Sequence, residues 1–172
     1  MTMKYLKIYE EFVPEINKTQ WVDSEFNKDE VPVQYRVTPS NIEEVGPNPN
    51  ETKKEVFVFG SNLQGIHTVG AARFAIDKGI ADEGQIEGPS KNGKGYAIPT
   101  QSDRQKLSLT EIKDYIQKFF DYAKDNKDTK FLVTKLGTGY AGYQLQDIAP
   151  LFAQAENITN IYLPKEFWDV IL

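Results

Sequence analysis

The sequence of 172 residues contains no cysteine and one histidine. The lack of cysteine excludes disulfides, a thiolate nucleophile and cysteine-ligated zinc, and is compatible with a reducing compartment. A single histidine excludes a metal site built from several imidazoles. We therefore expect neither a metal nor a cofactor.

Long apolar runs and an excess of positive charge are also missing. No stretch of about eighteen apolar residues occurs, and the N-terminus lacks the features of a secretory signal. Lys and Arg total 20 against 25 Asp and Glu, a net charge of -5, so the chain has no overall positive charge that would attract a nucleic-acid backbone. These absences predict a cytoplasmic protein that binds neither a membrane nor long nucleic acids.

What remains is the composition of one globular domain, with 40% hydrophobic and 12% aromatic residues. Proline and polar residues dominate the region before residue 55, which we assign to an N-terminal extension, residues 1–54, followed by a domain over 55–172. Within the extension the pattern predicts a short amphipathic helix over 3–12, a strand over 31–37 and a helical turn over 39–45.

From residue 55 onward, strand-like and helix-like patterns alternate. Ser108 and Glu111 form a capping box at the start of an amphipathic helix. The alternation implies βαβ units and a mostly parallel sheet. The expected strands are residues 55–59, 95–100, 130–136 and 158–163, and the expected helices are 69–78, 108–123, 146–155 and 165–172.

Two glycine-rich segments, here called loop 1 (residues 60–70) and loop 2 (residues 137–143), each follow an expected strand. At the carboxyl ends of strands in an open α/β sheet, glycines let the backbone approach a ligand and helix N-termini present unpaired N–H groups to anions. The two loops together favour a phosphate-binding site. Neither fits the P-loop or the strict dinucleotide fingerprint.

Side chains in and near the loops suggest chemistry, and each also has a structural interpretation. Asn62 is suited to ribose hydroxyls or a bound water, or to closing an Asx turn. His67 is suited to proton transfer or to a polar contact with phosphate. Arg73 is placed to reach a phosphate or to lie on a solvated helix face. Asp103 and Arg104 follow the strand over 95–100, and Asp147 is placed to favour a helix macrodipole.

The order of these motifs resembles a widespread family of bacterial and phage proteins, which in turn resembles macro domains. The likeness rests on residues 56–63, 65–67, 70–72, 97–100, 133–143 and 148–152. It implies a three-layer α/β/α fold with a mostly parallel mixed sheet and a small-molecule nucleotide ligand of the ADP-ribose or cyclic type. The acidic residue that receives adenine in macro domains has no counterpart before Glu55, which leaves the base open.

The resemblance and the loops together give a set of expected site residues. The expected ligand contacts are Gly60, Ser61, Asn62, Gly65, Ile66, His67, Gly70, Arg73, Thr100, Gly137, Thr138, Gly139, Tyr140, Ala141, Gly142 and Tyr143. In the alternative function, an ADP-ribosyl or N-glycosidic hydrolase, Asn62 and His67 are the catalytic residues. Whether the chain is an enzyme stays open at this point.

Two further resemblances involve the start of loop 1 and residues 3–15. The Phe59-Gly60-Ser61 opening is also similar to the family that includes phosphoribohydrolases, but the paired arginine and glutamate of that family are missing. Residues 3–15 resemble the leader peptides of some tailed-phage internal proteins, which are cut after a glutamate such as Glu10 or Glu15. In that hypothesis a phage-encoded protein travels inside the virion; the alternative is an amphipathic segment that packs on the domain or on a partner. A separate hypothesis for the function is a phage or bacterial protein without enzymatic activity that sequesters a nucleotide signal in host defence.

Overall fold

The computed structural model describes residues 31–172, which form one compact unit, Val31–Leu172. The expected helix over 3–12 and the expected cleavage points at Glu10 and Glu15 lie outside the described residues. The compact unit takes in residues 31–54, which the sequence analysis places in the extension. Instead of the expected strand over 31–37, this part has a 3-10 turn, η1 (Val33–Tyr35), and one bridge from Val37 to Leu163; it continues into a short helix, α2 (Ile42–Val45).

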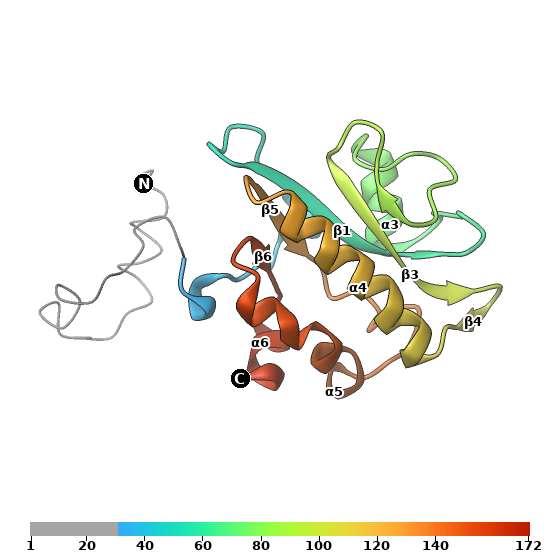
Figure 1. Ribbon diagram of the computed structural model, residues 1–172. Helices are drawn as coiled ribbons and strands as arrows, with labels where there is room; N and C mark the ends of the chain where they lie inside the picture. The colour runs from blue at the N-terminus through green and yellow to red at the C-terminus, as the bar shows by residue number, and fades with distance from the viewer. Residues whose placement is uncertain (1–30) are drawn as a thin grey trace, which may run out of the picture. The chain divides into compact units, whose positions relative to one another are not determined.

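Within the described residues, six strands form one sheet in the order β2-β3-β1-β5-β6, with β4 paired to β3 (Figure 1). The neighbours β3/β1, β1/β5 and β5/β6 are parallel, and β2 and β4 run antiparallel to β3. The strands are β1 (Lys54–Asn62), β2 (Gly88–Pro89), β3 (Gly95–Ser102), β4 (Gln105–Lys106), β5 (Thr129–Val133) and β6 (Ile161–Tyr162).

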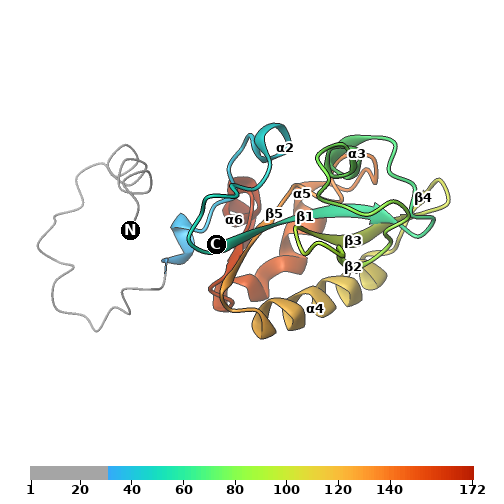
Figure 2. The ribbon, with the colours of Figure 1, turned by 90° about the horizontal axis from the view of Figure 1, so that it is seen from above.

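Helices cover both faces of this sheet, as Figure 2 shows with α3 on one side and α4 on the other. The remaining elements are α3 (Gly70–Asp77), α4 (Leu109–Asp125), α5 (Leu145–Ile148), the 3-10 helix η2 (Ala149–Asn157) and α6 (Lys165–Ile171). The expected three-layer α/β/α architecture with a mostly parallel mixed sheet is confirmed. None of the helices in residues 31–172 has the length and apolar character needed to cross a membrane.

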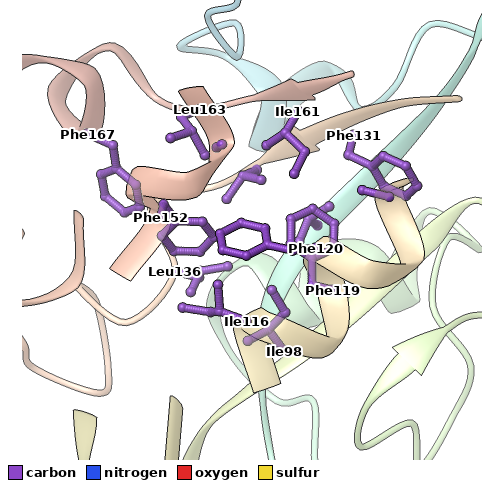
Figure 3. Packing of buried hydrophobic residues seen from close by; sticks show 14 of the residues in the cluster. Ile98, Ile116, Phe119, Phe120, Phe131, Leu136, Phe152, Ile161, Leu163 and Phe167 are labelled. Atoms are coloured by element: carbon purple, nitrogen blue, oxygen red, sulfur yellow. The ribbon is translucent and has the colours of Figure 1, made fainter. Parts of the chain in front are cut away.

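Alternation along the buried strands divides the core between the two faces. Phe57 and Phe59 of β1 pack with Ala72 and Ala75 of α3, whereas Val56 and Val58 face the opposite layer. That second, larger cluster is built on aromatic rings from α4, η2 and α6, shown in Figure 3. The rings of its central chain are Phe119, Phe120, Phe131, Phe152 and Phe167.

Local signals account for the boundaries of the long elements. Ser108 and Glu111 form the predicted capping box, with the Glu111 N–H donating to Ser108 Oγ (3.2 Å) and the Ser108 N–H donating to Glu111 Oε2 (2.9 Å). These contacts lower the pKa of Glu111. Pro150 lies in the first turn of η2, where its missing N–H costs no helical hydrogen bond. In place of one helix over 146–155, the structure has a short α-helix, α5, that continues directly into the 3-10 helix η2.

Sheet topology decides where a ligand site can form. From β1 the chain crosses through α3 to β3, and from β5 it crosses through α5 and η2 to β6 on the other side. The adjacent strands β1 and β5 therefore send their connections in opposite directions, and right-handed crossovers place the connecting helices on opposite faces. This is the topological switch point of an open α/β sheet, where the carboxyl ends of the strands open toward a ligand.

Candidate functional site

Loops 1 and 2 meet at this switch point. The Tyr140 ring in loop 2 lies 3.4 Å from the position that a Cβ would take on Gly70, the first residue of α3. From β3, Gln101 Nε2 donates a hydrogen bond to the Tyr140 carbonyl oxygen (2.9 Å). The structure therefore brings together the ends of β1, β3 and β5. Gln101 connects β3 to loop 2, a contact that sequence reasoning missed.

The first three residues of loop 1 belong to the end of strand β1. A Cβ on Gly60 would sit 3.3 Å from both the Leu136 Cβ and the Thr100 Oγ1, so this glycine lets neighbouring side chains close over the strand. Thr100 is buried, and its hydroxyl is 3.4 Å from the Ser61 carbonyl oxygen. Gly60 and Thr100 therefore pack closely together near the ends of β1 and β3.

Asn62 uses its side chain to close loop 1. Its Oδ1 accepts hydrogen bonds from the N–H groups of Gln64 (3.2 Å) and Ile66 (2.9 Å), and its Nδ2 donates to the Ile66 carbonyl oxygen (2.6 Å). This is the Asx-turn role of asparagine. The carboxamide oxygen that a ribose hydroxyl would need already accepts two bonds.

Ser61 and His67 hold a segment that we call the strap, residues 82–88. Ser61 Oγ donates to the Ile86 carbonyl oxygen, and His67 Nε2 lies 2.8 Å from the Gln85 carbonyl oxygen. Gly65 makes the closest approach, because a Cβ there would lie 2.5 Å from the Gly84 carbonyl oxygen, and its φ is +67°. Loop 1 and the strap therefore form one packed unit.

The surroundings of His67 fix what its ring can do. Only 6% of the residue is exposed, and the ring meets Phe59 edge-on at a centroid distance of 6.0 Å. Because the Gln85 carbonyl only accepts, Nε2 carries a proton and donates it to that oxygen. Within residues 31–172, Nδ1 has no hydrogen-bond partner. The ring is thus a buried donor to the strap.

Loop 2 uses part of its backbone internally and leaves part open. Thr138 Oγ1 donates to the Lys135 carbonyl oxygen (2.7 Å), and the Tyr143 N–H donates to Gly137 (3.0 Å). The Tyr143 hydroxyl donates to the Leu107 carbonyl oxygen (2.6 Å), directing that ring into the fold. In the described part of the chain, no hydrogen bond is made by the N–H groups of Gly139, Tyr140 and Ala141. The N–H groups of His67, Thr68 and Val69 in loop 1, which lead into α3, are open in the same way.

Exposed apolar side chains occur on both loops and on the strap. Tyr140 is 69% exposed, Ile66 56%, Val69 46% and Ile86 of the strap 38%. Two of these residues, Val69 and Ile86, are absent from the set of residues expected from sequence. Single exposed hydrophobic residues are ordinary, but four on two neighbouring loops and the strap form an apolar rim.

Arg73 and Asp147 make local contacts, and Asp147 lies in the first turn of α5, as the sequence predicts for a charge that favours a helix macrodipole. Arg73 pairs with Asp77 across one turn of α3 (2.9 Å), with about half of each side chain exposed, and Asp147 Oδ2 accepts from the Gln144 N–H (3.3 Å). Arg104 and Asp103 occupy the exposed turn between β3 and β4. No group of three or more His, Asp or Glu in residues 31–172 is placed to hold a metal ion.

An ion pair that the sequence analysis missed lies just before loop 2. Lys135 Nζ is 2.5 Å from Glu166 Oε1 in the first turn of α6, and this contact lowers the pKa of the Glu166 carboxyl. On α2, burial raises the pKa of Glu43 despite the opposing charge of Lys135. The pair joins the segment after β5 to helix α6, 31 positions further along the chain, which only the fold brings together.

Comparisons with known proteins give a distant likeness. No family model matches the chain, and no curated protein matches it. Among solved structures, a macrodomain protein from Streptomyces coelicolor is similar over 68% of this chain and 90% of that one, with a TM-score of 0.48 and 12% sequence identity. At this level of similarity the match assigns no ligand and no residue role.

Proposed function

We propose that the chain binds a nucleotide of the ADP-ribose or cyclic type, with the ligand phosphates held by backbone N–H groups of loop 2 and of the start of α3. The observation that carries the proposal is the unpartnered N–H triplet at Gly139, Tyr140 and Ala141, next to Gly70 at a helix N-terminus. Such N–H groups attract anions without a cationic side chain. Tyr140 and the apolar rim supply a surface for the base or for the second ribose.

Binding without turnover fits the contacts of the two polar residues nearest the ligand. A hydrolase needs a group that can move a proton at the reacting atom or hold an attacking water. Asn62 already bridges three backbone groups of loop 1, and His67 is buried against the strap. We therefore place binding ahead of hydrolysis, and a protein that binds without turnover would be suited to sequester a nucleotide signal.

Titration calorimetry with ADP-ribose, NAD and cyclic nucleotides tests the proposal. Gly139→Leu is designed to block the proposed site without disturbing the fold. An added Cβ on Gly139 would have no atom within 4 Å, and the φ of Gly139 lies outside the left-handed region. We expect heat of binding from the wild type and a loss of it in Gly139→Leu, with binding unchanged in Thr110→Leu on α4. Absence of binding at millimolar ligand would refute the proposal, as would equal binding by Gly139→Leu.

Chromatography of the recovered ligand separates binding from hydrolysis. We expect the ligand to return unchanged after prolonged incubation. Turnover that Asn62→Ala and His67→Ala each abolish, while both variants stay folded, would instead establish the hydrolase.

A further inference from the structure

Neither loop contains a charged residue. Loop 1, residues 60–70, and loop 2, residues 137–143, have no Lys, Arg, Asp or Glu between them. A phosphate at the proposed site would therefore meet backbone dipoles and uncharged side chains only.

Of four cationic side chains that flank the loops, three already have partners. Arg73 pairs with Asp77 at 2.9 Å, and Lys135 pairs with Glu166 at 2.5 Å. Lys106 Nζ lies 4.2 Å from the centroid of the Tyr143 ring. Arg104 remains in the exposed β3–β4 turn, beside Asp103. Among these four, Arg104 is the one for which residues 31–172 show no salt bridge or ring contact, and its substitution is therefore part of the test below.

The number of charges on a phosphate sets what such a site can accept. A phosphate esterified on two sides carries one negative charge, whereas a terminal phosphate monoester carries close to two at neutral pH, because its second pKa is about 6. Removing the second charge from water is costly unless a cation replaces the lost hydration. Backbone N–H groups supply only partial charges.

We propose that the site formed by loops 1 and 2 selects phosphodiesters, including bridging diphosphates, and rejects terminal phosphate monoesters. This inference rests on the proposed function, since it concerns the ligand of the same site. In this proposal the charge of the ligand phosphate, and not the identity of the base, decides which ligands bind.

Calorimetry with ADP-ribose and ADP, both measured on the full chain, tests the selection. At about pH 7.5 we expect ADP to bind at least roughly tenfold more weakly than ADP-ribose. Lowering the pH to about 5.5 protonates the terminal phosphate of ADP, whose second pKa is about 6, and we expect the affinity ratio to fall several-fold. ADP-ribose has no phosphate that titrates in this range, so its own pH dependence corrects for changes in the protein.

Added charge provides a second, independent readout. Ile66→Lys places a cation in loop 1 at an exposed position, and Leu172→Lys makes the same kind of change at the 63% exposed C-terminal residue. We expect Ile66→Lys to improve ADP binding relative to ADP-ribose and Leu172→Lys to leave the ratio unchanged. Arg104→Gln is expected to leave both affinities unchanged.

The outcomes separate this inference from the proposed function. If the ratio of ADP-ribose to ADP affinity is the same at both pH values, whatever its size, or if Arg104→Gln removes binding, the selection for phosphodiesters is overturned while nucleotide binding stands. If the wild type binds neither ligand, both proposals fail.

Discussion

Loops 1 and 2 have similar glycine content but opposite roles in the structure. In loop 1 the polar side chains Ser61, Asn62 and His67 all bond to nearby backbone, either in the loop itself or in the strap. Both loops leave three consecutive backbone N–H groups open, but Tyr140 of loop 2 is 69% exposed. Loop 1 is thus anchored to the strap by its side chains, whereas loop 2 presents an exposed aromatic ring.

A pair of glycine substitutions tests this difference most strongly. Gly65→Val combines a φ of +67° with a collision against Gly84, so we expect a loss of at least about 2 kcal/mol in the free energy of unfolding. Gly139→Ala meets no atom within 4 Å, and we expect a change within about 0.5 kcal/mol. Urea denaturation of both variants gives the comparison. Similar losses in the two variants would show that loop 1 is not braced.

His67 provides a test of the bond between loop 1 and the strap. His67→Leu leaves the Gln85 carbonyl oxygen without its donor, and we expect a cost of about 1–3 kcal/mol in unfolding free energy. His67→Gln retains a side-chain N–H and is expected to recover part of that loss. Urea denaturation measures both variants, and a neutral His67→Leu substitution would contradict the assigned contact.

Tyr140 is the residue for which stability and binding should separate. Its exposed ring contributes little to the core, so Tyr140→Ala is expected to change the free energy of unfolding by no more than about 0.5 kcal/mol. We expect ADP-ribose affinity to fall roughly tenfold when the aromatic surface is lost. Calorimetry and urea denaturation are run in parallel, with Leu172→Ala, at a 63% exposed position, as the control. Unchanged affinity would remove Tyr140 from the site.

Local patterns were enough to locate most elements of the domain. The β-branched and aromatic run at 55–59 predicted β1, and the Ser108 and Glu111 capping box predicted the start of α4. The expected strand over 31–37 was wrong, because the local residue pattern does not show whether a neighbouring strand is available for pairing. Residues 33–35 form a 3-10 turn, and only Val37 makes a bridge, to Leu163.

Arg36 shows why this part of the chain escaped sequence reasoning. The residue is 2% exposed, and its guanidinium donates to the carbonyl oxygens of Ala155 (2.8 Å), Glu156 (2.7 Å) and Ile158 (2.7 Å). These acceptors lie about 120 positions along the chain, and they are backbone groups that any sequence has. Nothing in the local pattern distinguishes such an arginine from a solvated one.

The sequence by itself determined the alternation of strands and helices, the two glycine loops and their freedom from charge, because these follow from local composition and spacing. Only the tertiary structure decided which polar side chains of the loops are already engaged. Whether a side chain is free depends on what packs against it, and the strap that occupies Ser61 and His67 comes from residues some 20 positions away. Long-range packing therefore anchored loop 1 to the strap and left the Tyr140 side chain of loop 2 exposed.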